Sequence, residues 1–130
     1  MHTTIFVNMP VADVARSRKF FSELGYPINE DFSGDTALTL VLGESQYAML
    51  LQRNTFDALH PIETADAFVV KECVVCLGVD SRDAVDTLVD RAIAAGATVG
   101  DTDDEGHMYG RSYHDLDGHS WQIFWFQPAT

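Results

Sequence analysis

Three histidines and two aspartates near the end of the chain carry side chains of the kind that bind divalent metal ions. They are His107, His114, Asp115, Asp117 and His119. Zinc, nickel and iron prefer imidazole nitrogen and carboxylate oxygen, and a site usually needs three or more such donors. The run from His114 to His119 also contains Gly118, and Asp and Gly favour a tight turn for backbone reasons alone. The segment predicts a turn between two strands, with a metal site as the alternative.

A second pair that could do chemistry is Cys73 and Cys76, spaced as C-x-x-C. A redox pair of this spacing normally opens a helix, whose N-terminus lowers the thiol pKa. Here the pair lies in the β-branched run ECVVCLGV, which indicates a strand, and strand residues three apart point to opposite faces. The pattern predicts buried, reduced cysteines. The sequence contains no G-x-S-x-G, P-loop or G-x-G-x-x-G motif.

The composition is that of one folded domain with a strongly acidic surface. The chain has 130 residues, of which 46% are hydrophobic, and its 20 acidic and 8 basic residues give a net charge of -12. Such a charge repels phosphate backbones and anionic lipid, so neither nucleic acid nor a membrane is an expected partner. The N-terminus has no basic leader and no long apolar run follows it, which predicts a cytoplasmic protein.

The elements that would position these residues occur twice. Ile5–Leu24 has the pattern of a short strand, a break and an amphipathic helix that ends at Gly25. Val74–Ala95 repeats the pattern and ends at Gly96. A repeat of about half the chain predicts two copies of one module, because each copy must bury its apolar face.

Each module is expected to have the order β-α-β-β-β within a single domain of residues 1–130. Module one, residues 1–53, has expected elements at Thr3–Pro10, Val14–Leu24, Ile28–Phe32, Thr36–Leu42 and Tyr47–Arg53. Residues 54–71 are the expected linker. Module two, residues 72–130, has expected elements at Glu72–Val79, Ser81–Ala95, Thr98–Thr102, Met108–His114 and Ser120–Gln127. The acidic run Asp101–Glu105 is expected to be a solvated loop.

The duplicated pattern, the opening segment Ile5–Asp13 and the C-terminal segment Met108–Trp125 together resemble the vicinal oxygen chelate superfamily. This is the fold of glyoxalase I, of bleomycin- and fosfomycin-resistance proteins and of extradiol dioxygenases, and the chain looks like the bacterial glyoxalase-like branch. The resemblance implies an α+β fold in which two βαβββ modules pair into a curved eight-stranded mixed sheet. That sheet encloses a cleft and has its helices on the outer face. It also implies a homodimer.

The resemblance locates the positions that carry metal ligands in metal-dependent members, on the first and fourth strands of each module. In this sequence they hold Phe6, Met49, Val74 and Gln122. A phenylalanine and a valine cannot coordinate a metal, and a glutamine offers one neutral oxygen. We therefore expect that the family's metal site is lost and that the protein has no cofactor.

Strand alternation adds neighbours to these positions, because every second side chain shares a face. Asn8 shares a face with Phe6, and Phe124 shares one with Gln122, whereas Trp121 and Ile123 should pack under a helix. Such a surface is apolar with a few polar anchors and suits a small, partly hydrophobic molecule. The alternative is that the aromatic side chains only fill the core.

Arg111, in the strand Met108–His114, is a further candidate because an arginine can clamp an anionic group. The alternative is an edge-strand charge paired with one of the many acidic residues.

Three functions fit these patterns. The first is a metal-free small-molecule-binding protein of the bleomycin-resistance kind. The second is a metal-dependent lyase, isomerase or dioxygenase of the glyoxalase type. The third is a degenerate module that acts only through dimerisation. The loss of donors at the ligand positions favours the first function.

Overall fold

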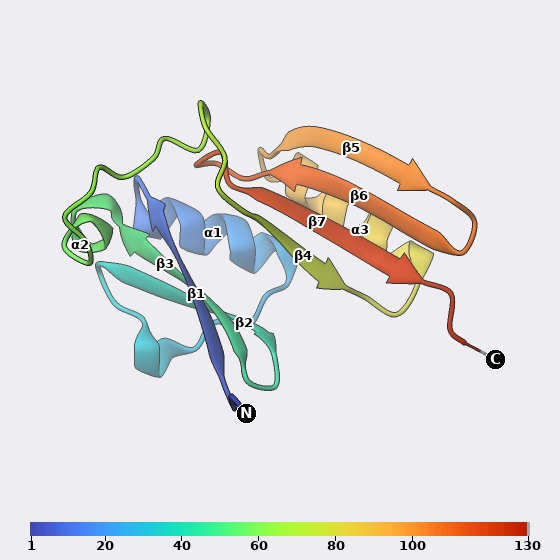
Figure 1. Ribbon diagram of the computed structural model, residues 1–130, viewed down its shortest axis with the longest axis horizontal. Coiled ribbons are helices and arrows are strands. Elements are labelled where there is room, and N and C mark those ends of the chain that lie inside the picture. Colours follow the sequence, from blue (N-terminus) through green and yellow to red (C-terminus); the bar gives the residue numbers. More distant parts are fainter. Residues whose placement is uncertain (130) are drawn as a thin grey trace. The chain divides into compact units, whose positions relative to one another are not determined.

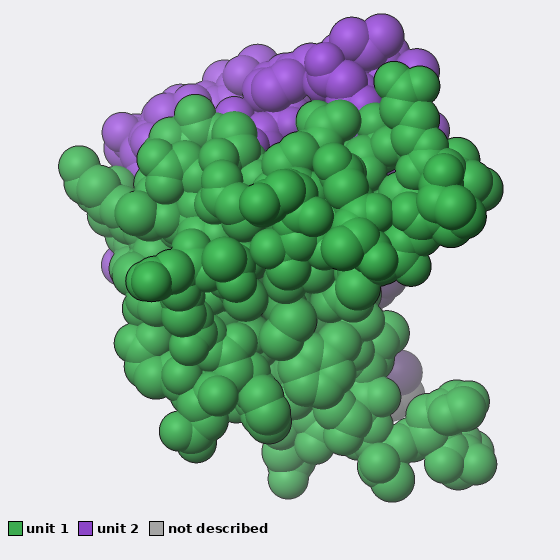
Figure 2. Space-filling view, turned by 90° about the vertical axis from the view of Figure 1, so that its left-hand side faces the viewer, with its two compact units in different colours: residues 1–64 green, residues 65–130 purple. Residues whose placement is uncertain are grey.

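A computed structural model of the chain describes residues 1–129 and contains two compact units. Unit 1 comprises Met1–Thr64 and unit 2 comprises Ala65–Thr130. Figure 1 traces the elements of each unit, and Figure 2 colours unit 1 green and unit 2 purple. Among the described residues, every helix is too short or too polar to serve as a membrane span.

Unit 1 is built on a three-stranded sheet, called sheet A here. Its elements are β1 (Ile5–Val11), α1 (Val14–Leu24), the 3-10 helix η1 (Glu30–Phe32), β2 (Ala37–Gly43), β3 (Gln46–Gln52) and α2 (Arg53–Asp57). The strand order is β1-β3-β2, in which β1 is parallel and β2 antiparallel to the central β3. β1 is therefore an edge strand of sheet A.

Helix α1 begins and ends where the sequence predicts. The Asp13 carboxylate accepts hydrogen bonds from the first free backbone N–H groups, and Gly25 closes the helix with a φ of 99°. The helix packs on β2 and β3 through an apolar face that includes Phe20, Phe21 and Leu24. These three side chains are buried, so α1 covers one face of sheet A.

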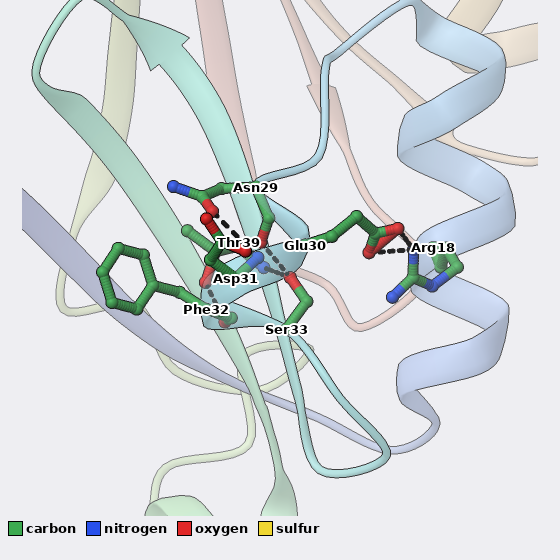
Figure 3. A network of polar contacts seen from close by, with 7 residues as sticks. All are labelled: Arg18, Asn29, Glu30, Asp31, Phe32, Ser33 and Thr39. Atoms are coloured by element: carbon green, nitrogen blue, oxygen red, sulfur yellow. Dashed lines mark hydrogen bonds and ion pairs between the residues drawn. The ribbon is translucent and has the colours of Figure 1, made fainter.

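The expected strand Ile28–Phe32 is wrong apart from its first residue. Ile28 makes one bridge to Leu40, and the chain then turns into η1. Side chains explain the change, because Asn29 accepts from the Asp31 N–H at 3.1 Å and Ser33 donates to the Asn29 carbonyl at 2.7 Å. These bonds compete with a sheet ladder. Figure 3 shows this cluster together with the ion pair of Arg18 and Glu30.

Unit 2 repeats the arrangement with one more strand, in sheet B. Its elements are β4 (Val74–Gly78), α3 (Arg82–Ala94), β5 (Thr98–Asp104), β6 (Met108–His114) and β7 (Ser120–Phe126). The order is β4-β7-β6-β5, with β4 parallel to β7 and the other pairs antiparallel. Helix α3 packs on β6 and β7, and Val85 and Val89 are buried there with Trp121 and Ile123. The predicted inward direction of Trp121 and Ile123 is thus confirmed.

The α+β class is confirmed, whereas one eight-stranded sheet is not. The described residues form seven strands, in sheets of three and four, because η1 replaces the strand expected at Ile28–Phe32. The acidic run also differs from the expected loop, since residues 101–104 belong to β5, in which Thr102, Asp103 and Asp104 pair with β6.

The two cysteines are free, as expected, but both are exposed rather than buried. Cys73 precedes β4, and Cys76 lies on the face of this strand that α3 does not cover. The expected burial is therefore wrong, because only one face of sheet B packs against a helix.

Arg82, at the start of α3, holds the end of the β5–β6 hairpin. Its guanidinium donates to both oxygens of Asp104 at 3.0 and 2.7 Å and to the Gly106 carbonyl at 2.9 Å. It also lies over the rings of Tyr109 and Trp125, at 4.9 and 5.3 Å from their centroids. The Arg82 hydrogen bonds, helped by the Gly106 N–H, lower the pKa of the Asp104 carboxyl from 3.8 to about 2.

This lowered pKa predicts how stability changes in acid. The Asp104 pKa is depressed in the folded state, so its contribution is present above pH 3.8 and is lost as the pH falls towards about 2. The difference in unfolding free energy between the wild type and Asp104→Asn should therefore be largest at neutral pH and should shrink across this window. Urea unfolding at several pH values measures it. Asp103→Asn, which removes the same charge from the same strand, is the control. An equal difference for Asp104→Asn at neutral and acid pH would contradict the prediction.

Candidate functional site

The face of sheet A that α1 leaves uncovered holds the first three candidate residues, and we call it open face A. Its side chains follow from the strand register: Phe6 lies opposite Tyr47, and Asn8 lies opposite Met49. Phe6 and Asn8 are exposed, whereas Met49 is half-buried. The alternate residues of the same strands, such as Met9 and Leu50, are buried. The structure thus brings Phe6, Asn8 and Met49 together on one surface.

Open face A also contains an aromatic cluster that sequence reasoning missed. The Phe6 and Tyr47 rings are stacked, with centroids 4.8 Å apart and an interplanar angle of 20°. The ring of Phe32, carried by η1, stands at 89° to Phe6 with centroids 6.1 Å apart. Phe6 is 41% and Phe32 54% exposed, so the cluster is accessible. The sequence patterns could not predict this cluster, because the cluster depends on the parallel register of β1 and β3 and on the formation of η1.

The uncovered face of sheet B, open face B, holds Val74, Gln122 and Phe124. Val74 lies opposite Ser120, and Gln122 lies opposite Cys76. The Cys76 thiol donates a hydrogen bond to Oε1 of Gln122, with a distance of 3.1 Å between the heavy atoms. Nearby, His114 Nδ1 and the Ser120 hydroxyl oxygen are 2.8 Å apart. Ser120 and Cys76 are thus further members of this face, and Cys76 was noted in the sequence only as half of a C-x-x-C pair.

Each unit carries two of the four family ligand positions, on two neighbouring parallel strands. The offset between these two positions across the strand pair is the same in both units. Phe6 and Met49 are diagonal rather than opposite neighbours across β1 and β3. Val74 and Gln122 are diagonal in the same way across β4 and β7. This equal register supports the duplication that the sequence predicts.

Arg111 lies apart from the other candidates. It is opposite Ile123, on the face of sheet B that α3 covers. Its guanidinium donates to Asp86 and to Asp90 of α3, each at 2.9 Å. The prediction that Arg111 clamps an anion on the candidate surface is therefore wrong. The alternative, pairing with acidic residues, is confirmed, although β6 is an inner strand rather than an edge strand. Asp86 and Asp90 are four residues apart on one helix face, a spacing that could have predicted this contact.

The Asp86 carboxylate also accepts a hydrogen bond from the Tyr109 hydroxyl at 2.6 Å. This bond, with the contact to Arg111, lowers the pKa of Asp86. The same bond, helped by desolvation, raises the pKa of Tyr109, which the Arg111 charge opposes. The group of charges fixes α3 to β6. It is a structural network, whose charges pair with one another on the face of sheet B that α3 covers.

The histidine–aspartate segment forms the predicted turn. Asp115 is 4% exposed, and its carboxylate accepts from the backbone N–H groups of Asp117 and His119 and from the Trp121 indole. Burial raises the pKa of this carboxyl, while the His119 charge and the hydrogen bonds oppose the rise. Within residues 1–129, no three His, Cys, Asp or Glu side chains are grouped closely enough to hold a metal ion.

Comparisons with known proteins extend these observations. Residues 3–39 match the family described as bleomycin resistance protein-like N-terminal. No protein of the curated set shows significant similarity. Among solved structures, a hypothetical protein, SA1046, from S. aureus is 26% identical with a TM-score of 0.81, covering 95% of this chain and 94% of that one.

Two further solved structures carry functional names. A glyoxalase/bleomycin resistance protein/dioxygenase family enzyme from Burkholderia phytofirmans PsJN is 20% identical, with a TM-score of 0.75 and coverage of 93% and 96%. A lactoylglutathione lyase from Agrobacterium tumefaciens is 18% identical, with a TM-score of 0.69 and coverage of 96% and 94%. These similarities extend along nearly the whole of each chain and show a shared fold.

Proposed function

Because the chain has the fold of the vicinal oxygen chelate superfamily, we propose that it is a small-molecule-binding protein of the glyoxalase/bleomycin-resistance kind that works without the family's metal ion. The ligand-binding residues are Phe6, Asn8 and Met49 on open face A, and Val74, Gln122 and Phe124 on open face B. In keeping with the family resemblance, we propose that it acts as a cytoplasmic homodimer.

The observation that carries this proposal is the chemistry of the four ligand positions. Phe6 and Val74 have no donor atom, the Met49 thioether is a soft donor, and the Gln122 amide oxygen already accepts from Cys76. Their cross-strand neighbours add an amide at Asn8 and a thiol at Cys76 but no carboxylate. A divalent metal of the zinc or nickel type needs several anionic or imidazole donors, so these residues do not fit it.

The accessible surface instead suits an uncharged or weakly polar ligand. Phe6 and Val74 are large apolar side chains that remain 41% and 51% exposed. Exposed apolar groups beside a few amide anchors are typical of ligand sites. The protein then acts by binding and sequestering its ligand, a role that requires no reacting group.

A metal-dependent glyoxalase-type lyase is the second candidate function. The fold similarity to a lactoylglutathione lyase favours it. One fold hosts many chemistries, however, and activity depends on the side chains of the site. Gln122 is the one family ligand position that retains an oxygen donor, so this candidate depends on it.

Metal analysis of the purified protein tests the proposal. Protein purified without chelator and dialysed against Zn²⁺, Ni²⁺ or Mn²⁺ should retain far less than one equivalent of each metal. The wild type and Gln122→Ala should give the same result, because Gln122 is not a ligand. One equivalent that is lost in Gln122→Ala would establish the lyase-type site instead. A thermal-shift screen of small aromatic compounds should then give ligands that raise the melting temperature by mass action.

A further inference from the structure

We infer that open face A binds an uncharged, planar heteroaromatic compound of the nucleobase type, stacked on Phe6 and hydrogen-bonded to Asn8. The inference rests on the proposed function and narrows it in two ways. It names the chemical class of the ligand, and it places the ligand on unit 1.

The Phe6 ring offers one face for stacking. Tyr47, on β3, covers the other face in the parallel stack with centroids 4.8 Å apart. β1 is the edge strand of sheet A, so no strand of this sheet lies beyond Phe6. The ring remains 41% exposed. The Phe32 ring stands perpendicular to Phe6, so it is not a further layer of the parallel stack, and we call it the wall of the site. A flat ring placed on Phe6 would extend the stack, which is a common way of binding bases.

The wall is held in place by the polar cluster around η1. The Thr39 hydroxyl donates to the Phe32 carbonyl at 2.6 Å, and the Thr39 N–H donates to the Ser33 hydroxyl at 3.0 Å. Figure 3 shows these bonds, with the Phe32 ring directed away from the ion pair of Arg18 and Glu30. Because Phe32 is fixed in this way, the aromatic cluster loses little conformational freedom when it binds a rigid ring.

Asn8 supplies the polar contact. It follows Phe6 on the same face of β1, about 6.6 Å further along the strand. Its exposed carboxamide has no hydrogen-bond partner within the part of the chain that the structure describes. A carboxamide combines a donor and an acceptor, and asparagine pairs bidentately with the adjacent donor and acceptor on the edge of adenine. A base stacked on Phe6 can present such an edge to Asn8.

Charge limits the class to compounds without a phosphate group. The side chains of open face A on β1 and β3 are uncharged, and unit 1 has eight acidic but only four basic residues. Among the described strand residues, β1, β2 and β3 place no arginine or lysine on this face to bind an anion. A nucleotide would therefore be repelled, whereas the free base would not.

A fluorescence titration with 2-aminopurine tests the inference, because stacking quenches this base. We expect saturable quenching, full competition by adenine, and competition by adenosine monophosphate that is about tenfold weaker at low salt. Phe6→Leu keeps the apolar volume but removes the ring, and Asn8→Leu removes the amide. Each should raise the dissociation constant about tenfold, while Phe6→Tyr keeps the ring and should bind like the wild type.

Phe126→Leu is the matched control, because it removes from sheet B a phenylalanine that is exposed like Phe6, to 59% compared with 41%. It should leave binding unchanged. The inference is overturned if Phe126→Leu weakens binding as much as Phe6→Leu, if the monophosphate competes as well as adenine, or if quenching is absent. If quenching is absent but another compound stabilises the metal-free protein, this inference is overturned and the proposed function is retained. One bound equivalent of metal that depends on Gln122 would instead remove the proposed function.

Discussion

Replacing Trp121 with alanine is expected to lower the free energy of unfolding by about 3–5 kcal/mol. The Trp121 side chain is fully buried beneath α3 and stacks on Tyr113, with ring centroids 6.5 Å apart. Alanine would lose the burial of a large ring and leave a cavity among Val85, Val89 and Ile123, which are also fully buried or nearly so. Cores pack densely, so neighbouring side chains can fill only part of such a space. Urea unfolding followed by far-UV circular dichroism gives the value.

Phe126→Ala is the control for this prediction because it removes an aromatic ring from the same strand. Phe126 is 59% exposed, so its loss should cost less than about 1 kcal/mol. A similar cost for both substitutions would mean that Trp121 does not anchor the core of unit 2.

Asp115→Ala is expected to destabilise the protein by about 3 kcal/mol or more, because it leaves three donors without their acceptor. These are the backbone N–H groups of Asp117 and His119, at 2.9 and 3.0 Å, and the Trp121 indole N–H at 2.9 Å. Asp115→Asn keeps one carbonyl oxygen in the turn and should lose about half as much. The same urea assay measures both variants.

A double-mutant cycle with Trp121→Phe makes this prediction specific. Trp121→Phe removes the indole donor, so the additional loss caused by Asp115→Ala should be smaller in that background by about 1 kcal/mol. Strictly additive losses would show that the buried indole bond contributes nothing. The cycle thus separates the bond from the general cost of disturbing the turn.

Much of the fold could be predicted because its determinants are local. The caps of α1, Asp13 and Gly25, are adjacent to the apolar pattern that they terminate, so the helix spans the expected residues. The alternation in β7 likewise separates Trp121 and Ile123 from Gln122 and Phe124. By contrast, η1 is also held by hydrogen bonds from Thr39 to Phe32 and Ser33, and Thr39 reaches them only because β2 folds back beside η1.

For the candidate site, the sequence offers positions but not their cross-strand partners. The family resemblance supplies the positions Phe6 and Gln122. It does not supply Tyr47 and Cys76, because they face these positions only through the register of parallel strands. Register depends on the packing of whole sheets. The chemistry of a site at this location therefore remains incomplete until the strand pairing is known.

The equal register of the two units has a practical consequence for engineering. Phe6 and Tyr47 occupy the same places on β1 and β3 as Val74 and Ser120 do on β4 and β7. Asn8 and Met49 correspond in the same way to Cys76 and Gln122. The two halves are thus alternative scaffolds with one backbone pattern, and a pair of side chains can be transplanted from one half to the other. Each half supplies the reference against which a graft in the other can be judged.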